Sequence, residues 1–384
     1  MLPENISSGR PLTVFHLVQP VEGGVARVVT DLVRAQVAEG MRAVVACPSG
    51  AGLASALAGS GAEVRPWRAG RAPGPSLPAE TAAAARLIRA CRPDVVHAHS
   101  SKAGLAARLA VRGRVPTVFQ PHAWSFEAVG GGTARLALAW ERYAARWAER
   151  VLCVSEAERS AGEAAGIDAR WAVIRNGVDL REFRADGPAG PGAAPLGPGP
   201  VVVCVGRLCR QKGQDVLLRA WPEIVRAVPG ARLVLVGDGP DRAPLARTAP
   251  PGVLFTGAVD RPRAWLHAAD LVVLPSRWEG MALAPLEAMA CGRPVVLTDV
   301  NGARESLPPG HERHGLVPPD DPHTLARAVR ELLADARLRE SLGSEAGAHA
   351  RANFDVRHTA AAVSELYRRL LGLPGSTTRE RISR

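Results

Sequence analysis

The sequence repeats one pattern twice. Short apolar runs rich in β-branched residues alternate with segments whose apolar residues recur at helical spacing. The first series runs from PLTVFHLV (11–18) to ERVLCVS (149–155), and the second from VVVCVG (201–206) to RPVVLTD (293–299). Buried strands that alternate with amphipathic helices form parallel sheets covered by helices on both faces. The sequence therefore predicts an α/β fold with two doubly wound, Rossmann-like domains.

A segment dense in glycine and proline, RADGPAGPGAAPLGPGP, separates the two series. Such a composition does not hold regular structure and is typical of linkers. The chain of 384 residues also exceeds the usual size of one domain, which favours two. The predicted organisation is an N-terminal domain over 1–184, a linker over 185–200, a C-terminal domain over 201–355, a helix over 356–372 that packs back toward the N-terminal domain, and a disordered tail over 373–384.

Composition excludes some classes of partner. Aromatic residues make up only 4% of the chain, which argues against a nucleic-acid-binding surface built on stacked rings. The net charge of +11 is spread along the sequence and favours an anionic substrate or an anionic membrane surface. The six cysteines form no CxxC pair, and the sequence shows neither a secretion signal nor a membrane-spanning apolar run. The expected location is therefore the cytoplasm.

Candidate ligand-binding residues follow the predicted strands. Open α/β sheets bind ligands at the carboxyl ends of their strands, so two such sheets favour a site in the cleft between them. Gly23 and Gly24 open a helix, where free N–H groups favour an anion; a simple tight turn is the alternative. Arg207 and Lys212 follow VVVCVG and suit phosphate oxygens, unless they are merely solvated. The only other lysine of the chain is Lys102.

Two glutamates lie eight positions apart around a stretch of small apolar residues, EGMALAPLE. Pro285 suits the first position of a helix, which predicts Glu279 in the preceding loop and Glu287 in the first helical turn. The amides of residues 281–284 would then point toward an anion. The alternative is that Glu287 interacts only with the helix dipole. That alternative does not explain Glu279.

The segment PSRWEGMALAPLEAMACGRPVVLTDVNGARE resembles the E-x(7)-E signature of glycosyltransferase family 4, a family of retaining sugar transferases with the GT-B fold. Further motifs resemble those of the family, in the same order, along almost the whole chain: VEGGVARVV, QPHAWSFE, VLCVSEAER, VIRNGVD, VGRLCRQKG, LVGDGP and GLVPPDDPHTLARAV. The resemblance implies two Rossmann-like domains that face each other across a cleft. It also implies that the N-terminal domain binds the acceptor and that the C-terminal domain binds a nucleotide sugar.

The resemblance further implies roles for single residues. Arg207 and Lys212 hold the diphosphate, Glu279 faces the hydroxyls of the donor sugar, and Glu287 faces those of the ribose. The implied catalytic residues are His122, Glu279, Arg207 and Lys212. The implied donor-binding residues are Gly23, Gly24, Gly206, Arg207, Lys212, Gly280, Met281, Ala282, Leu283, Ala284 and Glu287. The family's common loop is EGFG, so Ala282 is a departure that is expected to narrow the sugar pocket.

No metal or other cofactor is expected. Cations and amides placed at the diphosphate can stabilise the leaving group by themselves. The sequence contains no Asp-x-Asp, and His97 and His99, two positions apart at a strand end, are weak candidates for a metal site.

The segment TARLALAWERYAARWAER is a candidate partner surface. At helical spacing, Leu136, Trp140, Tyr143 and Trp147 share one face, and arginines line an adjoining face. This pattern predicts either a peripheral membrane helix over 134–150 or a helix that packs its aromatic residues on the sheet. The membrane alternative favours a polyprenyl-linked acceptor at the inner face of the membrane, whereas the packing alternative leaves a soluble acceptor open.

These observations predict a retaining, nucleotide-sugar-dependent hexosyltransferase that acts on an acceptor hydroxyl of a lipid-linked or cell-surface glycan precursor in polysaccharide biosynthesis. The alternatives are transfer to an inositol phosphate or a secondary metabolite, and a nucleotide-sugar-binding protein without activity. A nucleotide-sugar epimerase on a similar fold also remains open. A phosphorylase needs a Schiff-base lysine, for which only two candidates exist. A dehydrogenase is disfavoured because the G-x-G-x-x-G fingerprint is absent.

Overall fold

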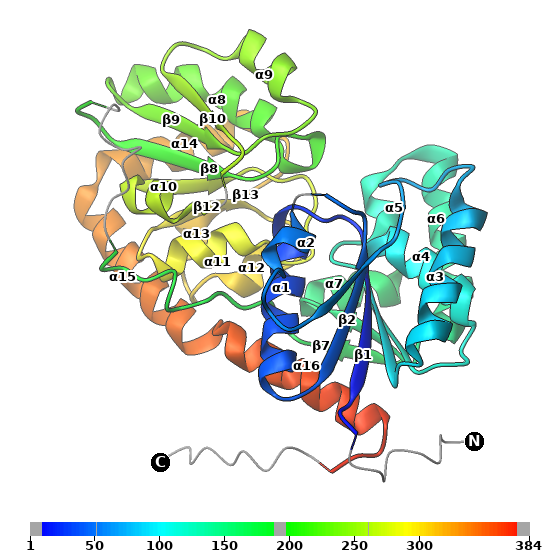
Figure 1. Ribbon diagram of the computed structural model, residues 1–384. Helices are drawn as coiled ribbons and strands as arrows, with labels where there is room; N and C mark the ends of the chain where they lie inside the picture. The colour runs from blue at the N-terminus through cyan, green and yellow to red at the C-terminus, as the bar shows by residue number, and fades with distance from the viewer. Residues whose placement is uncertain (1–9, 51, 188–196, 260, 375–384) are drawn as a thin grey trace.

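Two parallel sheets organise the chain, and the domains built on them face each other (Figure 1). The computed structural model describes residues 10–50, 52–187, 197–259 and 261–374. The predicted α/β fold with two doubly wound domains is confirmed. Much of the predicted linker (188–196) and of the predicted tail (375–384) lies outside the described residues.

The N-terminal domain contains a seven-stranded sheet with the order β3-β2-β1-β4-β5-β6-β7. Its strands are β1 (Thr13–Val18), β2 (Arg42–Cys47), β3 (Glu63–Pro66), β4 (Val95–His99), β5 (Thr117–Gln120), β6 (Arg150–Cys153) and β7 (Trp171–Val173). Its helices are α1 (Gly23–Ala38), α2 (Leu53–Ala56), α3 (Leu77–Cys91), α4 (Ser100–Val111), α5 (Ser125–Ala128), α6 (Gly131–Ala144), the 3₁₀ turn η1 (Ala145–Trp147) and α7 (Glu156–Ala164).

The C-terminal domain contains a six-stranded sheet with the order β10-β9-β8-β11-β12-β13. Its strands are β8 (Val201–Val205), β9 (Arg232–Val236), β10 (Val253–Gly257), β11 (Leu271–Leu274), β12 (Val295–Thr298) and β13 (Leu316–Val317). Its helices are the 3₁₀ turn η3 (Arg210–Lys212), α8 (Gln214–Ala227), α9 (Arg242–Thr248), α10 (Arg263–Ala268), α11 (Leu283–Ala290), α12 (Ala303–Ser306), α13 (Glu312–Gly315), α14 (Pro322–Ala334) and α15 (Ala336–Asn353). The sequence pattern missed β7 and β13, which are too short to show a periodicity.

Both sheets reverse their winding direction at the first strand of the domain. β1 pairs with β2 on one side and β4 on the other, and β8 likewise lies between β9 and β11. At such a switch point the loops after the two neighbouring strands separate to opposite faces, which leaves a crevice for a ligand. The loops after β1, β4, β8 and β11 are the ones that carry most of the candidate residues.

The chain returns to the N-terminal domain after α15. The last helix, α16 (Val356–Leu370), lies beside α1, as the red and blue helices of Figure 1 show. Its Tyr367 is fully buried in a core cluster with Val14 of β1 and Val118 of β5. The C-terminal end of the chain thus forms part of the N-terminal core.

A buried ion pair holds α6 on the N-terminal domain. The guanidinium of Arg108 on α4 donates to the carboxylate of Glu141 on α6 at 2.7 Å, and both side chains are 1% exposed. Arg108 also donates to the carbonyl of Gly104 at 2.9 Å and lies 3.8 Å above the ring of Phe119. Because the pair is closed off from water, loss of one partner leaves an uncompensated charge in the core.

Substitution Glu141→Leu is expected to lower the free energy of unfolding by about 3–5 kcal/mol, because Arg108 loses its buried carboxylate partner. The double substitution Arg108→Met with Glu141→Leu should recover most of that loss. Urea unfolding followed by circular dichroism measures both. Glu163→Gln, in an exposed ion pair of α7, is the control and should cost less than about 1 kcal/mol. Equal losses for Glu141→Leu and Glu163→Gln would contradict the account.

Candidate active site

The loop after β8 presents two cations to the cleft. Gly206 and Arg207 follow the strand, and η3 ends at Lys212. Gly213 has φ = +64°, and a side chain there would overlap the carbonyl oxygen of Pro275, so only glycine fits this turn. The Nε of Arg207 is buried and makes no hydrogen bond within the described residues. A buried donor of this kind is expected to have a partner, which a bound anion can supply.

Glu279 lies in the loop after β11, as predicted. Its Oε1 accepts hydrogen bonds from Lys212 Nζ at 2.6 Å and from Ser276 Oγ at 2.7 Å. The loop itself is fixed to η3, because Gln211 donates to the carbonyl of Trp278 at 3.0 Å. The structure thus brings the loops after β8 and β11 together and joins one predicted cation to one predicted carboxylate.

Glu287 differs from the prediction in its position on the helix. Helix α11 begins at Leu283, so Pro285 is its third residue and Glu287 lies beyond the first turn. The helix starts earlier than expected because Ala282 already has the extended backbone of an N-cap, and proline is tolerated anywhere in the first turn, where its missing N–H has no partner to lose. The dipole explanation for Glu287 is correspondingly weaker.

Glu287 is paired across the domain boundary. Its carboxylate accepts a hydrogen bond from Arg27 of α1 at 2.6 Å and is 5% exposed. Burial raises the pKa of Glu287, and the charge of Arg27 counteracts that rise. The start of α1 lies close by, because a Cβ at Gly24 would lie 3.9 Å from Leu283 Cδ1. Gly23 has φ = +74° and begins the helix.

Gly280 is in close contact with the N-terminal domain. Ser155 donates to its carbonyl at 2.8 Å, and Asn176 donates to the carbonyl of Met281 at 2.8 Å. A Cβ at Gly280 would lie within 3.0 Å of Glu158 Oε1 and of the Ala123 nitrogen. The loop that carries Gly280, Met281 and Ala282 is therefore held by the N-terminal domain.

His122 lies on the N-terminal side of this contact. It has φ = +57°, and the next residue, Ala123, has φ = +109°. Glu158 accepts the Ala123 N–H at 2.6 Å and the Val154 N–H at 2.7 Å, which stabilises this uncommon backbone conformation. Burial raises the pKa of Glu158 to about 7. Ala123, which contacts Gly280, directly follows His122 in the sequence.

Several functional candidates were missed by the sequence analysis. Arg27 lies directly after the glycine turn in VEGGVARVV, and Ser276 lies in the same loop as Glu279. Burial and the charge of Arg207 lower the pKa of Arg71, which places this N-terminal arginine near the cations of the C-terminal domain. Glu158 belongs to the quoted motif VLCVSEAER, but the motif alone does not indicate that its carboxylate accepts a hydrogen bond from the backbone next to His122.

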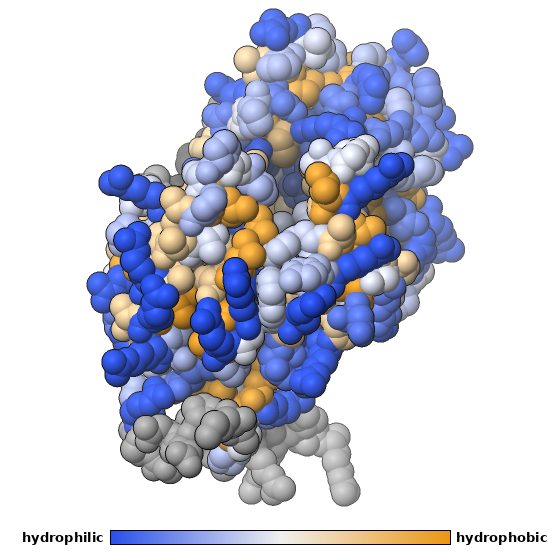
Figure 2. Space-filling view, turned by 90° about the vertical axis from the view of Figure 1, so that its right-hand side faces the viewer, coloured by the Kyte–Doolittle hydropathy of each residue, from blue (hydrophilic) through white to orange (hydrophobic). Residues whose placement is uncertain are grey.

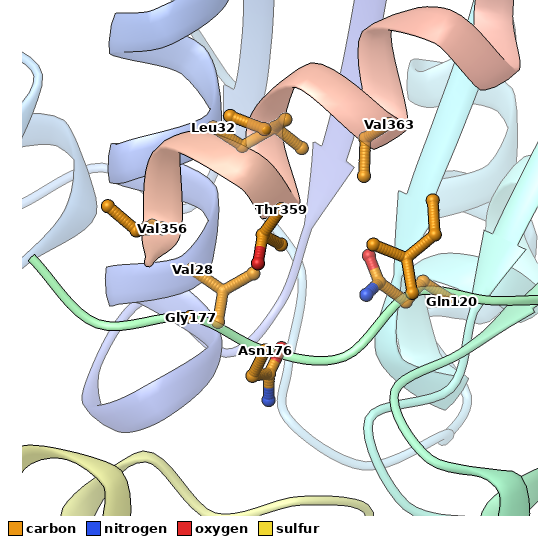
Figure 3. Close-up of a pocket in the computed structure, with 10 residues that line it drawn as sticks. Val28, Leu32, Gln120, Asn176, Gly177, Val356, Thr359 and Val363 are labelled. Atoms are coloured by element: carbon orange, nitrogen blue, oxygen red, sulfur yellow. The ribbon is translucent and has the colours of Figure 1, made fainter. Parts of the chain in front are cut away.

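Two hollows accompany the cleft. One is lined by Ser276, Glu279, Ala282, Asn301 and Gly302 and lies directly at the candidate site. The other lies between α1, α16 and the segment after β7, and Figure 3 shows its largely apolar lining. None of the predicted donor-binding residues lines this second pocket, whereas Glu279 and Ala282 line the first. The expected narrowing of a sugar pocket by Ala282 stays a prediction.

Comparisons with known proteins agree with this geometry. Residues 22–182 match the model of the family described as Glycosyltransferase Family 4, and residues 199–335 match that of the family described as Glycosyl transferases group 1. The lipopolysaccharide core biosynthesis mannosyltransferase LpcC of Rhizobium leguminosarum bv. viciae is 35% identical over 52% of this chain and 60% of LpcC. The alpha-maltose-1-phosphate synthase of Mycolicibacterium smegmatis is 33% identical over 72% of this chain and 79% of that protein. For three of the curated relatives, this chain spans only 48–60% of the relative's length.

Solved structures share the fold. The structure of Anabaena Alr3699/HepE in complex with UDP and glucose superimposes with a TM-score of 0.79 over 92% of this chain and 99% of that chain, at 24% identity. At this identity the likeness concerns the fold alone, and it agrees with the predicted GT-B arrangement. Both halves of the chain match models of glycosyltransferase families. The chain also covers 79% of the alpha-maltose-1-phosphate synthase at 33% identity. The chain therefore belongs to glycosyltransferase family 4, among the group 1 glycosyl transferases.

Proposed function

We propose that this protein is a retaining glycosyltransferase that moves a sugar from a nucleoside-diphosphate sugar to an acceptor hydroxyl. The observation that carries the proposal is the meeting of Lys212 and Glu279 at 2.6 Å at one switch point, with Arg207 in the same loop. Cations suit a diphosphate, and a carboxylate suits sugar hydroxyls. Both features of a nucleotide sugar thus find complementary groups within one short stretch of the cleft.

The cations act on the leaving group. When the bond between the anomeric carbon and the diphosphate breaks, negative charge builds up on the diphosphate. Arg207 and Lys212, together with the unpaired amides at the start of α11, stabilise that charge in the transition state. In this proposal, charges of the protein itself perform the neutralisation, and no metal or other cofactor takes part.

The carboxylates orient the two sugars. Glu279 accepts hydrogen bonds from hydroxyls of the donor sugar. Glu287 accepts hydrogen bonds from the ribose hydroxyls, which are added to its hydrogen bond from Arg27 or replace it. Because Glu279 already accepts two hydrogen bonds, from Lys212 and Ser276, it is better suited to hold a hydroxyl than to attack carbon. This supports front-face transfer with retention, in which the acceptor approaches from the side that the diphosphate leaves.

A thermal-shift screen against UDP-, GDP-, ADP- and dTDP-sugars tests the donor site. One nucleotide class should raise the melting temperature of the wild type, because a ligand that binds only the folded protein stabilises it by mass action. Arg207→Ala and Glu287→Ala should lose that shift while they remain folded. A well-folded wild type that responds to none of the four classes would favour a binding protein without transferase activity.

Two further variants separate catalysis from binding. Lys212→Ala is expected to lower kcat by about 10²–10³, because one donor to the developing negative charge is lost. Release of the nucleoside diphosphate in the presence of acceptor measures the rate, and release without sugar transfer identifies mere hydrolysis. Arg226→Ala, an exposed arginine at the end of α8, is the matched control and should keep the wild-type rate. Equal rates in Lys212→Ala and Arg226→Ala would exclude the assigned role.

We further propose that the acceptor is lipid-linked and that α6 contacts the membrane surface. Leu136 is 75% exposed and Tyr143 is 48% exposed, and the guanidinium of Arg146 lies 4.0 Å from the centre of the Tyr143 ring. Figure 2, which faces this side of the N-terminal domain, shows hydrophobic residues between strongly hydrophilic ones. Exposed apolar and aromatic groups next to cations suit an anionic lipid surface. Among the described helices, none is long and apolar enough to cross a membrane.

Vesicle co-sedimentation tests the membrane contact. The wild type should bind vesicles that contain phosphatidylglycerol more strongly than vesicles of phosphatidylcholine alone. Leu136→Ser combined with Tyr143→Ser should reduce binding severalfold, because the inserted apolar area is lost. Leu254→Ser, at another exposed hydrophobic residue on β10, is the control. If the two sets of variants bind alike, the soluble acceptor, such as an inositol phosphate or a secondary metabolite, becomes the better assignment.

A further inference from the structure

Four histidines form a continuous row beneath the cleft. His16 is on β1, His97 and His99 are on β4, and His122 follows β5. The first three are completely buried. The sequence analysis considered His97 and His99 only as a weak metal pair and did not consider His16. Strand pairing brings His16 close to His97 and His99, because β1 and β4 are neighbours in the sheet with His16 opposite His97.

A chain of hydrogen bonds runs from α1 to the candidate site. Gln36 Oε1 lies 2.8 Å from His16 Nε2, and His16 Nδ1 lies 3.0 Å from His99 Nε2. His99 Nδ1 then lies 3.2 Å from His122 Nε2. Each of these ring nitrogens makes one contact of this chain, so the protonation of one ring determines that of the next, and the side chain of Gln120 adds a hydrogen-bond contact to His97 and to His99.

All the rings of the row are neutral at physiological pH. Burial lowers the pKa of His16 to about 4 and that of His122 to about 3, and burial and the neighbouring histidines hold the pKa values of His97 and His99 well below the ordinary range. A neutral imidazole has one N–H donor and one acceptor nitrogen. The first group of the hydrogen-bonded chain therefore determines which nitrogen donates and which accepts in every ring that follows.

That group is the side-chain amide of Gln36. Its nitrogen donates to the hydroxyl of Tyr367 on α16 at 3.5 Å, and its oxygen faces His16. Since the oxygen can only accept, His16 carries its proton on Nε2 and accepts at Nδ1. His99 must then donate from Nε2 and accept at Nδ1, which leaves His122 with its proton on Nε2.

We propose that Gln36, His16 and His99 are positioning residues that hold His122 as the Nε2–H tautomer, so that its Nδ1 accepts a hydrogen bond from a hydroxyl of the donor sugar. This inference rests on the proposed function. Within the described residues no hydrogen bond involves His122 Nδ1, so this atom can accept a hydrogen bond from a ligand. The backbone is held independently, through Glu158 and the Ala123 N–H.

A metal site is the competing explanation for the same rings. Nitrogens of His16, His97 and His99 lie within 4.8 Å of one another. Two histidine nitrogens on a tetrahedral zinc ion, each bonded at about 2.0–2.1 Å, would be roughly 3.3 Å apart. The rings of His97 and His99, however, are tilted against each other with centres 3.9 Å apart and planes inclined by 32°, and ring nitrogens of His16 and His99 lie 3.0 Å apart, at hydrogen-bond distance. The hydrogen-bonded chain fits this arrangement better.

The tautomer can be measured directly on the full-length protein. Long-range ¹H–¹⁵N spectra of protein labelled at histidine distinguish the two tautomers, and the His122→Gln variant assigns the His122 signals. The wild type should show His122 with its proton on Nε2 alone. Gln36→Leu should produce a mixture of both tautomers at His122, because nothing then orients the chain. Gln36→Glu should restore the single tautomer, because both carboxylate oxygens accept.

Binding measurements test the consequence for the donor. Calorimetry compares the nucleotide sugar that stabilises the protein in the thermal screen with the nucleoside diphosphate alone. His99→Leu should weaken the nucleotide sugar about tenfold and the nucleoside diphosphate by less than about twofold, because only the sugar contacts His122. His99→Asn, whose amide oxygen can accept from His122, should recover most of the affinity. A merely structural role would weaken both ligands equally.

Three results would overturn the inference. They are a proton on Nδ1 of His122 in the wild type, an unchanged His122 tautomer in Gln36→Leu, and stoichiometric metal in the purified protein with His16 and His99 as ligands. Equal weakening of both ligands in His99→Leu would also contradict it. Failure of the proposed function gives a different result, because the protein would then bind no nucleotide sugar while the tautomer of His122 could still be read.

Discussion

The contact of Gly280 with the N-terminal domain determines how the two halves of the candidate site meet. Its carbonyl accepts from Ser155, and its missing side chain leaves room for Glu158 and for the backbone of Ala123. Any side chain at this position would separate the loop after β11 from the loop after β5. The glycine thus brings His122 next to the loop of Glu279, so that residues of both domains can contact one ligand.

The charges in the cleft are arranged in pairs. Lys212 with Glu279, and Arg27 with Glu287, place each carboxylate against a cation at 2.6 Å. Buried carboxylates need such partners to remain ionised. The buried histidines carry no charge that needs a partner, because burial keeps them neutral, and nitrogens of His16, His99 and His122 are hydrogen-bonded to one another. Charge is therefore kept where a diphosphate and hydroxyls would bind, and neutral groups lie beneath.

Much of the fold and part of the site could be predicted because their signals are local. Alternating strands and helices define a doubly wound sheet, and the carboxyl ends of the strands then indicate where Arg207, Lys212 and Glu279 must lie. The errors have local causes as well. The short strands β7 and β13 have no periodicity, and an extended Ala282 starts α11 two residues before Pro285. The partners Arg27 and Glu158 contact groups far away in the sequence, so no local pattern reveals them.

The sequence by itself determined the two-domain α/β architecture and the family, because apolar periodicity and the order of short motifs are properties of the linear chain. It also predicted the residues that are proposed here to contact a nucleotide sugar. Only the tertiary structure decided that Arg27 pairs with Glu287, that Tyr367 of the last helix reaches the N-terminal core, and that His16 lies opposite His97. Those relations depend on strand register and on the closure of the two domains, which bring together residues separated by 81 to 331 positions.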